Sequence, residues 1–312
     1  MPLKRILEKY GIYIFMFLLL IVASIASPAF LNPSNLRDVF NQVAPLAIVG
    51  IGQTFVILAG NEGIDLSVAS VMCAVAVIAA IVMEGQNSMF LPVSLLCLLF
   101  GLFVGLINGL LITKRKTPPV MTTLGMMILV QGFRYIYSGG APTGDFPPIM
   151  RFLATGSILG FPASMITLSI IGAISIIILR KTNLGRQIYA TGGNINTAKL
   201  CGYNTDFILT LVYMISGFCS AIAGLYLGGW VGVVDLNVGY GYEIDSIAVV
   251  VMGGTSFEGG RGGVLGTIAG VIILRVLYNI ILLMHFPITA QYVVKGAVIV
   301  LAAYFYTRRK RR

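Results

Sequence analysis

Long apolar runs separated by short polar segments dominate the chain. A helix needs about 20 apolar residues to cross the hydrocarbon core of a bilayer. The pattern predicts ten crossing segments, at residues 11–30, 44–59, 68–83, 89–113, 120–138, 161–179, 207–230, 243–253, 264–284 and 290–306. We therefore predict an all-α, polytopic integral membrane protein of about ten transmembrane helices, in which residues 1–312 form a single transmembrane domain.

Two glycine-rich segments interrupt this pattern, at residues 60–67 (the first break) and residues 253–263 (the second break). Lipid cannot hydrogen-bond an unwound main chain, so such breaks persist only at the surface, inside protein or beside a wet cavity. Paired interruptions in the two halves of a chain indicate a transporter's substrate path. The substrate-path candidates are Asn61, Asp65, Ser67, Thr255 and Phe257. The alternative is a pair of tight cytoplasmic turns, with Asp65 and Ser67 as helix caps.

A polar stretch between two long apolar tracts, residues 180–206, carries a short helix signal. Asn194 can cap a helix over residues 195–201, and Gly202 can end it in a left-handed conformation. Two helical turns are not stable alone in water. The stretch therefore predicts a surface that docks on another protein, or else a solvated loop between two spans.

The distribution of basic residues predicts the orientation of the chain. It holds 21 Lys and Arg against 11 Asp and Glu, a net charge of +10. The basic residues gather before the first span, at 114–116, at 180–199 and in the tail at 307–312. Cytoplasmic loops collect Lys and Arg, so ten crossings place both termini and all four basic segments in the cytoplasm. We interpret the tail as a flank attracted to anionic lipid and not as a nucleic-acid site.

Composition agrees with a lipid environment. Hydrophobic residues make up 57% of the chain and charged residues 10%, against about 25% charged in soluble domains. Three basic residues still fall within or near the spans: Arg134, Arg275 and Lys295. We expect Arg134 to extend toward the outer surface, and Arg275 and Lys295 to pair with Glu243, Asp245 or carbonyl groups. The outer segments 139–160 and 231–242 are either a landing surface or plain connectors.

Catalytic and metal-binding motifs are missing from the sequence. It has no Gly-x-x-x-x-Gly-Lys-Ser/Thr phosphate loop, no His-Glu-x-x-His and no Gly-x-Ser-x-Gly, so neither ATP hydrolysis nor metalloenzyme or triad chemistry can be assigned. The single histidine, His285, has no second ligand nearby, and we expect the four cysteines to be free thiols. We predict a chain that is not an enzyme and holds no metal or cofactor.

Four stretches resemble the membrane permease subunits of bacterial ribose-type ABC sugar importers, and together they span most of the chain. The first is Gly63-Ile64-Asp65-Leu66-Ser67-Val68-Ala69-Ser70, with Ala69 where the family usually has glycine. The second lies within residues 185–202, the third runs from Glu243 into the second break, and the fourth covers residues 291–303. Asn61-Glu62 resembles a small insertion, and Ile195 and Asn196 stand where the family often has proline and glutamate.

The resemblance implies a transport mechanism. The family's permeases work in pairs, as homodimers or heterodimers, with a cytoplasmic ATPase that binds ATP and an extracytoplasmic sugar-binding protein, in the bacterial plasma (inner) membrane. The polar stretch would be the coupling helix seated on the ATPase. The implied ATPase-coupling residues are Gly185, Arg186, Gly192, Gly193, Asn194, Asn196, Thr197, Ala198, Lys199 and Gly202. The cargo would be a monosaccharide, ribose or a similar pentose or hexose.

A rival hypothesis is a passive channel or an ion-coupled transporter of small solutes that needs no ATPase. Buried Asp65, Glu62 or Glu258 acting as ion carriers would favour it. Deleting residues 195–201 separates the two hypotheses, because passive flux would survive the deletion and ATPase-driven uptake would not. A membrane-embedded enzyme lacks any catalytic constellation.

Overall fold

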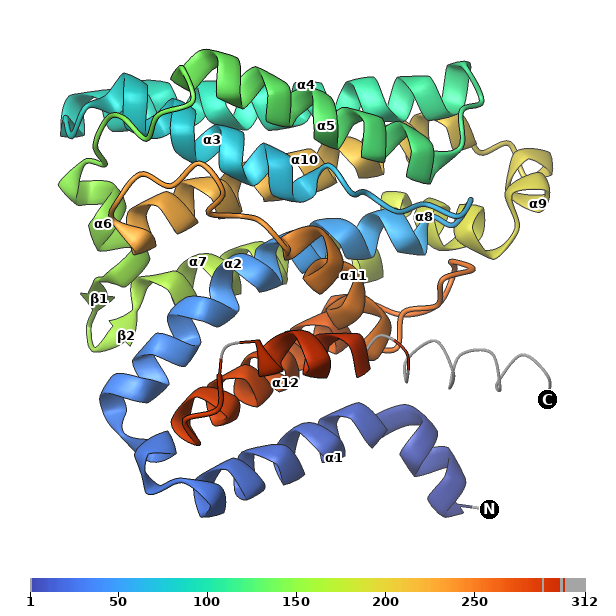
Figure 1. Ribbon diagram of the computed structural model, residues 1–312. Helices are drawn as coiled ribbons and strands as arrows, with labels where there is room; N and C mark the ends of the chain where they lie inside the picture. Colours follow the sequence, from blue (N-terminus) through green and yellow to red (C-terminus); the bar gives the residue numbers. More distant parts are fainter. Residues whose placement is uncertain (1, 288, 298–299, 301–312) are drawn as a thin grey trace.

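The computed structural model describes residues 2–287, 289–297 and 300 of the chain, and it is almost entirely helical (Figure 1). The α-helices are α1 (Pro2–Ala26), α2 (Pro33–Leu58), α3 (Val68–Met83), α4 (Phe90–Lys114), α5 (Pro119–Ser138), α6 (Pro148–Thr155), α7 (Ala163–Lys181), α8 (Asn183–Gly193), α9 (Ile195–Leu200), α10 (Thr205–Val231), α11 (Tyr242–Met252) and α12 (Val264–Leu283). Short 3-10 helices η1 (Pro28–Leu31) and η2 (Asn87–Met89) precede α2 and α4, and residues 290–297 are also helical.

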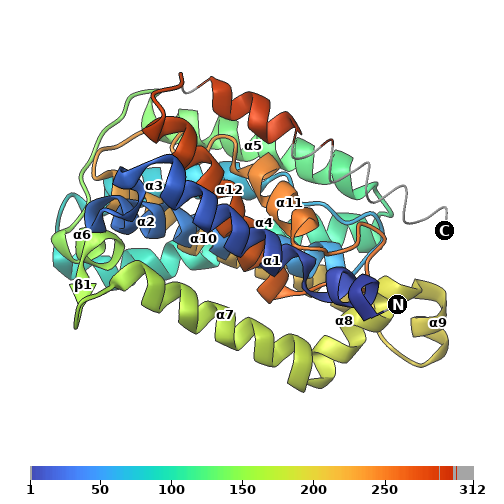
Figure 2. The ribbon, with the colours of Figure 1, turned by 90° about the horizontal axis from the view of Figure 1, so that it is seen from below.

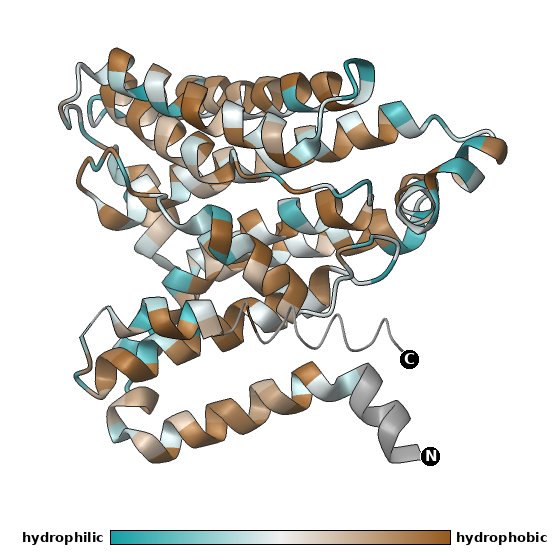
Figure 3. Ribbon diagram, turned by 45° about the vertical axis from the view of Figure 1, so that its right-hand side comes forward, coloured by the Kyte–Doolittle hydropathy of each residue, from teal (hydrophilic) through white to brown (hydrophobic). Residues whose placement is uncertain are grey.

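Length and composition of the helices agree with a membrane protein. Within the described residues, five segments are long and apolar enough to cross a bilayer: Pro33–Leu58, Asn87–Lys114, Ala163–Lys181, Thr205–Val231 and Val264–Leu283. Figure 3 shows apolar residues along the sides of these helices and hydrophilic residues gathered toward their ends. The prediction of an all-α membrane protein is confirmed, whereas the number of crossings and the side of each terminus stay predictions.

The predicted spans coincide with helices, and most boundaries agree within a few residues. The main difference is α2, which begins at Pro33 and not near residue 44. Proline is favoured in the first helical turn, and the Asn32 side chain caps this helix by accepting a hydrogen bond from the Ser34 N–H at 3.2 Å. The last predicted span is described only over residues 290–297 and at residue 300, and the basic tail lies outside the described residues.

Two helices form the centre of the bundle. Helix α2 is buried throughout residues 43–58, and α10 packs against α4, α2 and α3. Helix α4 approaches α10 closely at Gly101, Gly105 and Gly109, where a Cβ on Gly105 would lie 2.2 Å from the Tyr213 carbonyl oxygen. Small residues at four-residue spacing permit this packing between helices in lipid. Helices α4 and α7 are mostly exposed; α4 lies along one edge of the bundle in Figure 1, and α7 lies along one edge in Figure 2.

The two ends of the bundle differ in structure. At one end lie α6 and a short antiparallel hairpin of β1 (Ser157–Ile158) and β2 (Phe161–Pro162). Helix α6 and strand β1 lie within the predicted outer segment 139–160, and β2 follows directly after it. At the other end lie α8 and α9, on the same side as the start of α1 (Figures 1 and 2). The site described below is at this second end.

Candidate functional site

The polar stretch between α7 and α10 folds into two consecutive helices. Asn194 caps α9 by accepting a hydrogen bond from the Thr197 N–H at 2.9 Å. Gly202 has a φ of +82°, and its N–H donates to the Lys199 carbonyl at 2.9 Å. The predicted short helix, its cap and its left-handed end are therefore confirmed.

Helix α8 was not predicted. The sequence contains a signal for it, because Thr182 accepts a hydrogen bond from the Gly185 N–H at 3.3 Å and so caps the helix. Leu184 and Ile188 are four residues apart and form its apolar side, with Ile188 fully buried. The segment is therefore helical and not an irregular loop, and whether it docks on a partner stays a prediction.

The residues predicted to couple the chain to an ATPase divide into exposed and buried groups. Five exposed residues cluster on and around α9: Asn194, Asn196, Thr197, Lys199 and Gly202. Arg186 and Gly193 on α8 are also exposed, and Arg186 hydrogen-bonds to Asn183. Three predicted residues are buried: Gly185, Gly192 and Ala198.

Burial changes what the three buried residues can do. Only 2% of Ala198 is exposed, so its side chain packs inward and not toward a partner. A Cβ on Gly185 would lie 2.2 Å from the Leu179 carbonyl oxygen, so a glycine is needed for the tight passage from α7 into α8.

Sequence reasoning missed the most prominent side chain of this surface. Leu200 is 90% exposed at the end of α9, next to the exposed thiol of Cys201. An exposed leucine on a polar helix is a candidate anchor for a protein partner, since burying a leucine contributes about 1.5–3 kcal/mol. The other three cysteines, Cys73, Cys97 and Cys219, are buried free thiols.

The first break begins as an exposed turn and continues as a buried extended segment. Asn61 and Glu62 are exposed and have φ values of +57° and +54°. Asp65 is only 1% exposed. Its carboxylate accepts hydrogen bonds from the Ser67 N–H at 3.0 Å, the Ser67 hydroxyl at 2.6 Å and the Ser216 hydroxyl at 2.7 Å.

Side chains from neighbouring helices satisfy the main chain of this segment. The Thr123 hydroxyl donates to the Ile64 carbonyl at 3.0 Å. The Gln53 amide, oriented to match donor with acceptor, bridges the N–H and the carbonyl of Asp65 at 3.2 Å each. The Asn108 amide donates to the Ser67 hydroxyl at 3.0 Å. Buried polar groups require such partners, and here they come from α2, α4 and α5.

The second break is a glycine-rich turn. The Ser256 N–H donates to the Arg261 carbonyl at 2.9 Å and closes the turn. Five of its glycines have positive φ: Gly254, Gly259, Gly260, Gly262 and Gly263. Thr255 is buried, and its hydroxyl has no hydrogen-bond partner among the described residues.

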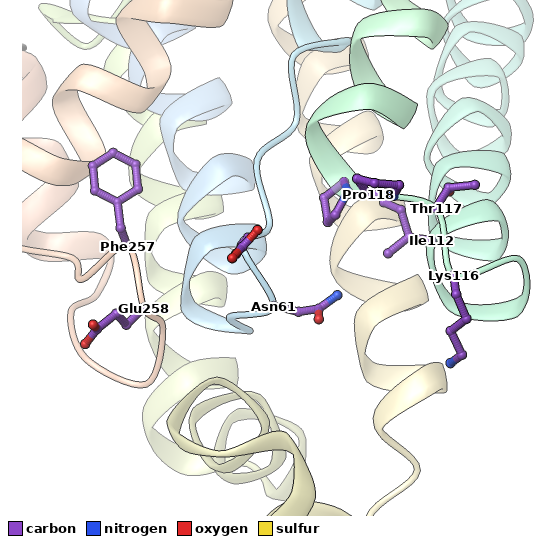
Figure 4. Close-up of a pocket in the computed structure, with 9 residues that line it drawn as sticks. Asn61, Ile112, Lys116, Thr117, Pro118, Phe257 and Glu258 are labelled. Carbon is purple, nitrogen blue, oxygen red and sulfur yellow. The ribbon is translucent and has the colours of Figure 1, made fainter.

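A pocket of about 820 Å³ lies between the two breaks and the connection from α4 to α5 (Figure 4). Its lining is Asn61, Glu62, Ile112, Lys116, Thr117, Pro118, Pro119, Phe257 and Glu258. Figure 4 shows Phe257 and Glu258 on one side, Lys116 and Thr117 on the other, and Asn61 between them. An aromatic ring among amide, hydroxyl and charged groups suits a small polar molecule.

The pocket brings together two of the five substrate-path candidates, Asn61 and Phe257. Asp65, Ser67 and Thr255 do not line it. Sequence reasoning missed the contribution of Lys116 and the prolines beside it, although the basic loop was visible. Lys116 also forms an ion pair with Asp206 at the start of α10, at 3.6 Å.

The basic residues inside the bundle have different environments. Lys295 pairs with Asp245 at 2.8 Å, as expected. The Arg275 guanidinium lies over the rings of Tyr242 and Tyr278, 5.3 Å and 5.8 Å from their centroids.

Arg134 requires a correction. It is only 3% exposed and donates to Asn237 at 3.0 Å, so it does not extend to the surface. The side chain ties α5 to the connection between α10 and α11.

Comparison with known proteins gives a consistent set of relatives. The family model described as branched-chain amino acid transport system / permease component matches residues 35–303. The chain is 36% identical over 302 residues to the ribose import permease protein RbsC of Haemophilus influenzae, covering 96% of this chain and 93% of that protein. It is 37% identical over 304 residues to RbsC of Bacillus subtilis, covering 95% and 92%. No solved structure matches the chain.

A relative named for a different sugar is nearly as similar. The galactose/methyl galactoside import permease protein MglC of Escherichia coli K12 is 35% identical over 327 residues, covering 97% of this chain and 96% of that protein. The sequence resemblance stated above is thereby confirmed at the level of the family.

Proposed function

The chain belongs to the family of branched-chain amino acid transport system permease components, and from this premise we propose that it is the transmembrane permease subunit of an ABC importer for a monosaccharide. The observation that carries the choice of cargo is that its relatives are named ribose and galactose permeases and align over nearly its full length. Ribose or a similar pentose or hexose is the proposed cargo. Transport, and not an enzymatic reaction, is the family's activity.

The energy source is a separate cytoplasmic ATPase, and α9 is its proposed docking element. The sequence has no phosphate-binding loop, so a chain that drives uphill transport depends on a partner. The exposed residues on and around α9 form the docking surface, with Leu200 as its apolar anchor. Hot spots in interfaces are typically few buried anchors within a wider polar surface.

The proposed topology has ten crossings in the bacterial inner membrane, with both termini in the cytoplasm. The positive-inside rule supports it. Helices α8 and α9 lie at the same end of the bundle as the beginning of α1 (Figure 1). An extracytoplasmic sugar-binding protein would then deliver cargo at the end that carries α6 and the β-hairpin.

A second permease subunit, identical or related, is proposed to cover the side of the bundle where the non-helical segments lie. In Figure 1 the connection from α2 to α3 and the connection from α10 to α11 run along the near side. Tyr240, in the connection from α10 to α11, is 79% exposed, and Ile244, at the start of α11, is 44% exposed. Lipid cannot satisfy non-helical main chain, and a second copy meets this need. The two breaks and the pocket would then face the sugar path.

Replacing the proposed anchor tests the docking of the ATPase. Leu200→Ser should weaken binding of the ATPase about tenfold or more, because it removes a buried leucine from the interface. Leu159→Ser is the matched control, since Leu159 is 95% exposed at the tip of the β-hairpin, at the opposite end. The readout is co-purification of the ATPase together with maleimide labelling of Cys201, which the bound ATPase should protect. Equal labelling with and without the ATPase would refute docking at α9.

Deleting residues 195–201 tests the class of transporter. The chain should still insert in the membrane, and sugar uptake should be abolished. Uptake that survives the deletion would support the passive or ion-coupled alternative.

A further inference from the structure

Three segments that are far apart in the sequence cross at glycines, main chain against main chain. They are the end of α2 with the start of the first break, the end of α8, and the second break. A Cβ on Gly192 would lie 1.8 Å from the Leu58 carbonyl oxygen and 2.6 Å from the Gly260 nitrogen. A Cβ on Gly259 would lie 2.6 Å from the Gly60 Cα and 2.9 Å from the Gly192 Cα. We call this crossing of Leu58, Gly60, Gly192, Gly259 and Gly260 the glycine junction.

Hydrogen bonds hold the junction from both sides. The Gly260 N–H donates to the Leu58 carbonyl at 2.9 Å, which links the second break to the end of α2. The Tyr189 hydroxyl donates to the Gly262 carbonyl at 2.9 Å, which links α8 to the second break. Burial raises the pKa of the Tyr189 phenol above its ordinary value, with Arg180 acting in the opposite direction. A tyrosine hydroxyl of ordinary pKa, about 10, is protonated at neutral pH, so this hydroxyl is a donor there.

The junction lies directly beside the pocket. Asn61 and Glu62, which line one part of the pocket, follow Gly60 in the chain. Phe257 and Glu258, which line another part, precede Gly259. The same α8 that enters the junction at Gly192 continues through Asn194 into α9. A short, closely packed path therefore connects the exposed surface of α9 to both break segments of the pocket wall.

We infer that Tyr189 and Gly192 are positioning residues that join the α8–α9 unit to both breaks, so that a displacement of α9 moves both break segments of the pocket wall together. This inference rests on the proposed function, because it takes the displacement to come from a docked ATPase. Main-chain segments in direct contact have no side chains between them that could shift to absorb a displacement. Closely packed interiors therefore move as rigid bodies and do not deform smoothly. Because the connection from α4 to α5 is outside the junction, movement at the docking surface would change the distance between the two breaks and Lys116 and Thr117 on the opposite wall of the pocket.

The test uses the complete importer, with the ATPase and the binding protein, in proteoliposomes. Tyr189→Phe removes the hydroxyl and keeps the ring. It should leave ATPase co-purification unchanged and lower the sugar transported per ATP hydrolysed about threefold to tenfold, the effect of losing one hydrogen bond. Tyr203→Phe is the control, because Tyr203 lies between α9 and α10, outside the junction. The sugar-to-ATP ratio is the deciding readout, since a general loss of folded protein lowers both rates and leaves their ratio unchanged.

Gly192→Ala gives an independent check. It should retain ATPase binding through α9 and lose uptake tenfold or more, because the methyl group forces α8 away from Leu58. A Tyr189→Phe importer that keeps the wild-type sugar-to-ATP ratio would overturn the inference, and so would equal losses in Tyr189→Phe and Tyr203→Phe. A wild-type chain that binds no ATPase would instead refute the proposed function.

Discussion

The two breaks are similar as sequence and different as structure. Each is a glycine-containing interruption between apolar segments. The first break places Asp65 and Ser67 in the buried interior, where hydrogen bonds from four neighbouring helices, α2, α4, α5 and α10, satisfy the segment. The second break has five glycines of positive φ and is closed by its own main chain, with Glu258 and Arg261 exposed.

The difference shows that the same sequence pattern, a glycine-containing interruption of an apolar run, occurs for two different physical reasons. The first break needs polar side chains, because an extended main chain in an apolar interior must find donors and acceptors. The second break needs the absence of side chains, because it passes within contact distance of Gly60 and Gly192. Substitutions should therefore act through hydrogen bonding at the first break and through crowding at the second.

Removing the carboxylate of the first break should have the largest effect. Asp65→Ala leaves two hydroxyl groups and one N–H without their buried acceptor, and we expect a loss of about 3 kcal/mol or more in stability. Asp65→Asn keeps one acceptor oxygen and should lose clearly less. A thiol-reactive dye follows thermal unfolding, since Cys73, Cys97 and Cys219 become reactive only when the bundle opens. An Asp65→Ala protein that unfolds at the same temperature as the wild type would contradict the account of the first break.

Crowding at the second break should have an intermediate effect, and the chain offers a matched pair. Gly254 and Gly259 have nearly the same φ, +85° and +87°, but a Cβ on Gly254 meets nothing within 4 Å. Alanine at either position has the left-handed cost of about 1–2 kcal/mol. Gly259→Ala should lose about 1–3 kcal/mol more than Gly254→Ala, because the added methyl group overpacks the junction. The same thermal assay measures the difference, and equal melting of the two variants would argue against the close crossing.

Changing the pocket wall should have the smallest effect, and on transport alone. Phe257→Ala removes the aromatic side chain of the pocket, and we expect sugar uptake to fall about fivefold, equivalent to roughly 1 kcal/mol. Thermal stability should stay near that of the wild type. Phe286→Ala, at a phenylalanine that is 53% exposed and does not line the pocket, is the control. Unchanged uptake in Phe257→Ala would remove this pocket from the sugar path.

The helices could be predicted from the sequence because bilayer thickness fixes the length of an apolar span. Local signals also sufficed for α9, since Asn194 and Gly202 define its ends. Helix α8 was not predicted because only two residues, Leu184 and Ile188, form its apolar side. Which way Ala198 and Leu200 point could not be read from a helix of six residues, where the hydrophobic period is too short to establish a face.

The arrangement of the site depends on tertiary structure that no local pattern encodes. Asn61, Lys116 and Phe257 come from three distant segments, and only the packing of α2, α4 and α11 places them around one pocket. Arg134 was expected at the surface because long basic side chains usually reach water. Its partner, Asn237, comes from a connection a hundred residues away.

The glycine junction is built from main-chain atoms, whereas the pocket beside it is lined by side chains. The side chains at positions 61, 62, 257 and 258 belong to the same two segments but do not build the crossing. If the pocket lies on the sugar path as proposed, substitutions at these four positions would alter cargo preference and leave the proposed linkage intact. The same linkage between the ATPase and the pocket could in this way operate in permeases for chemically different nutrients.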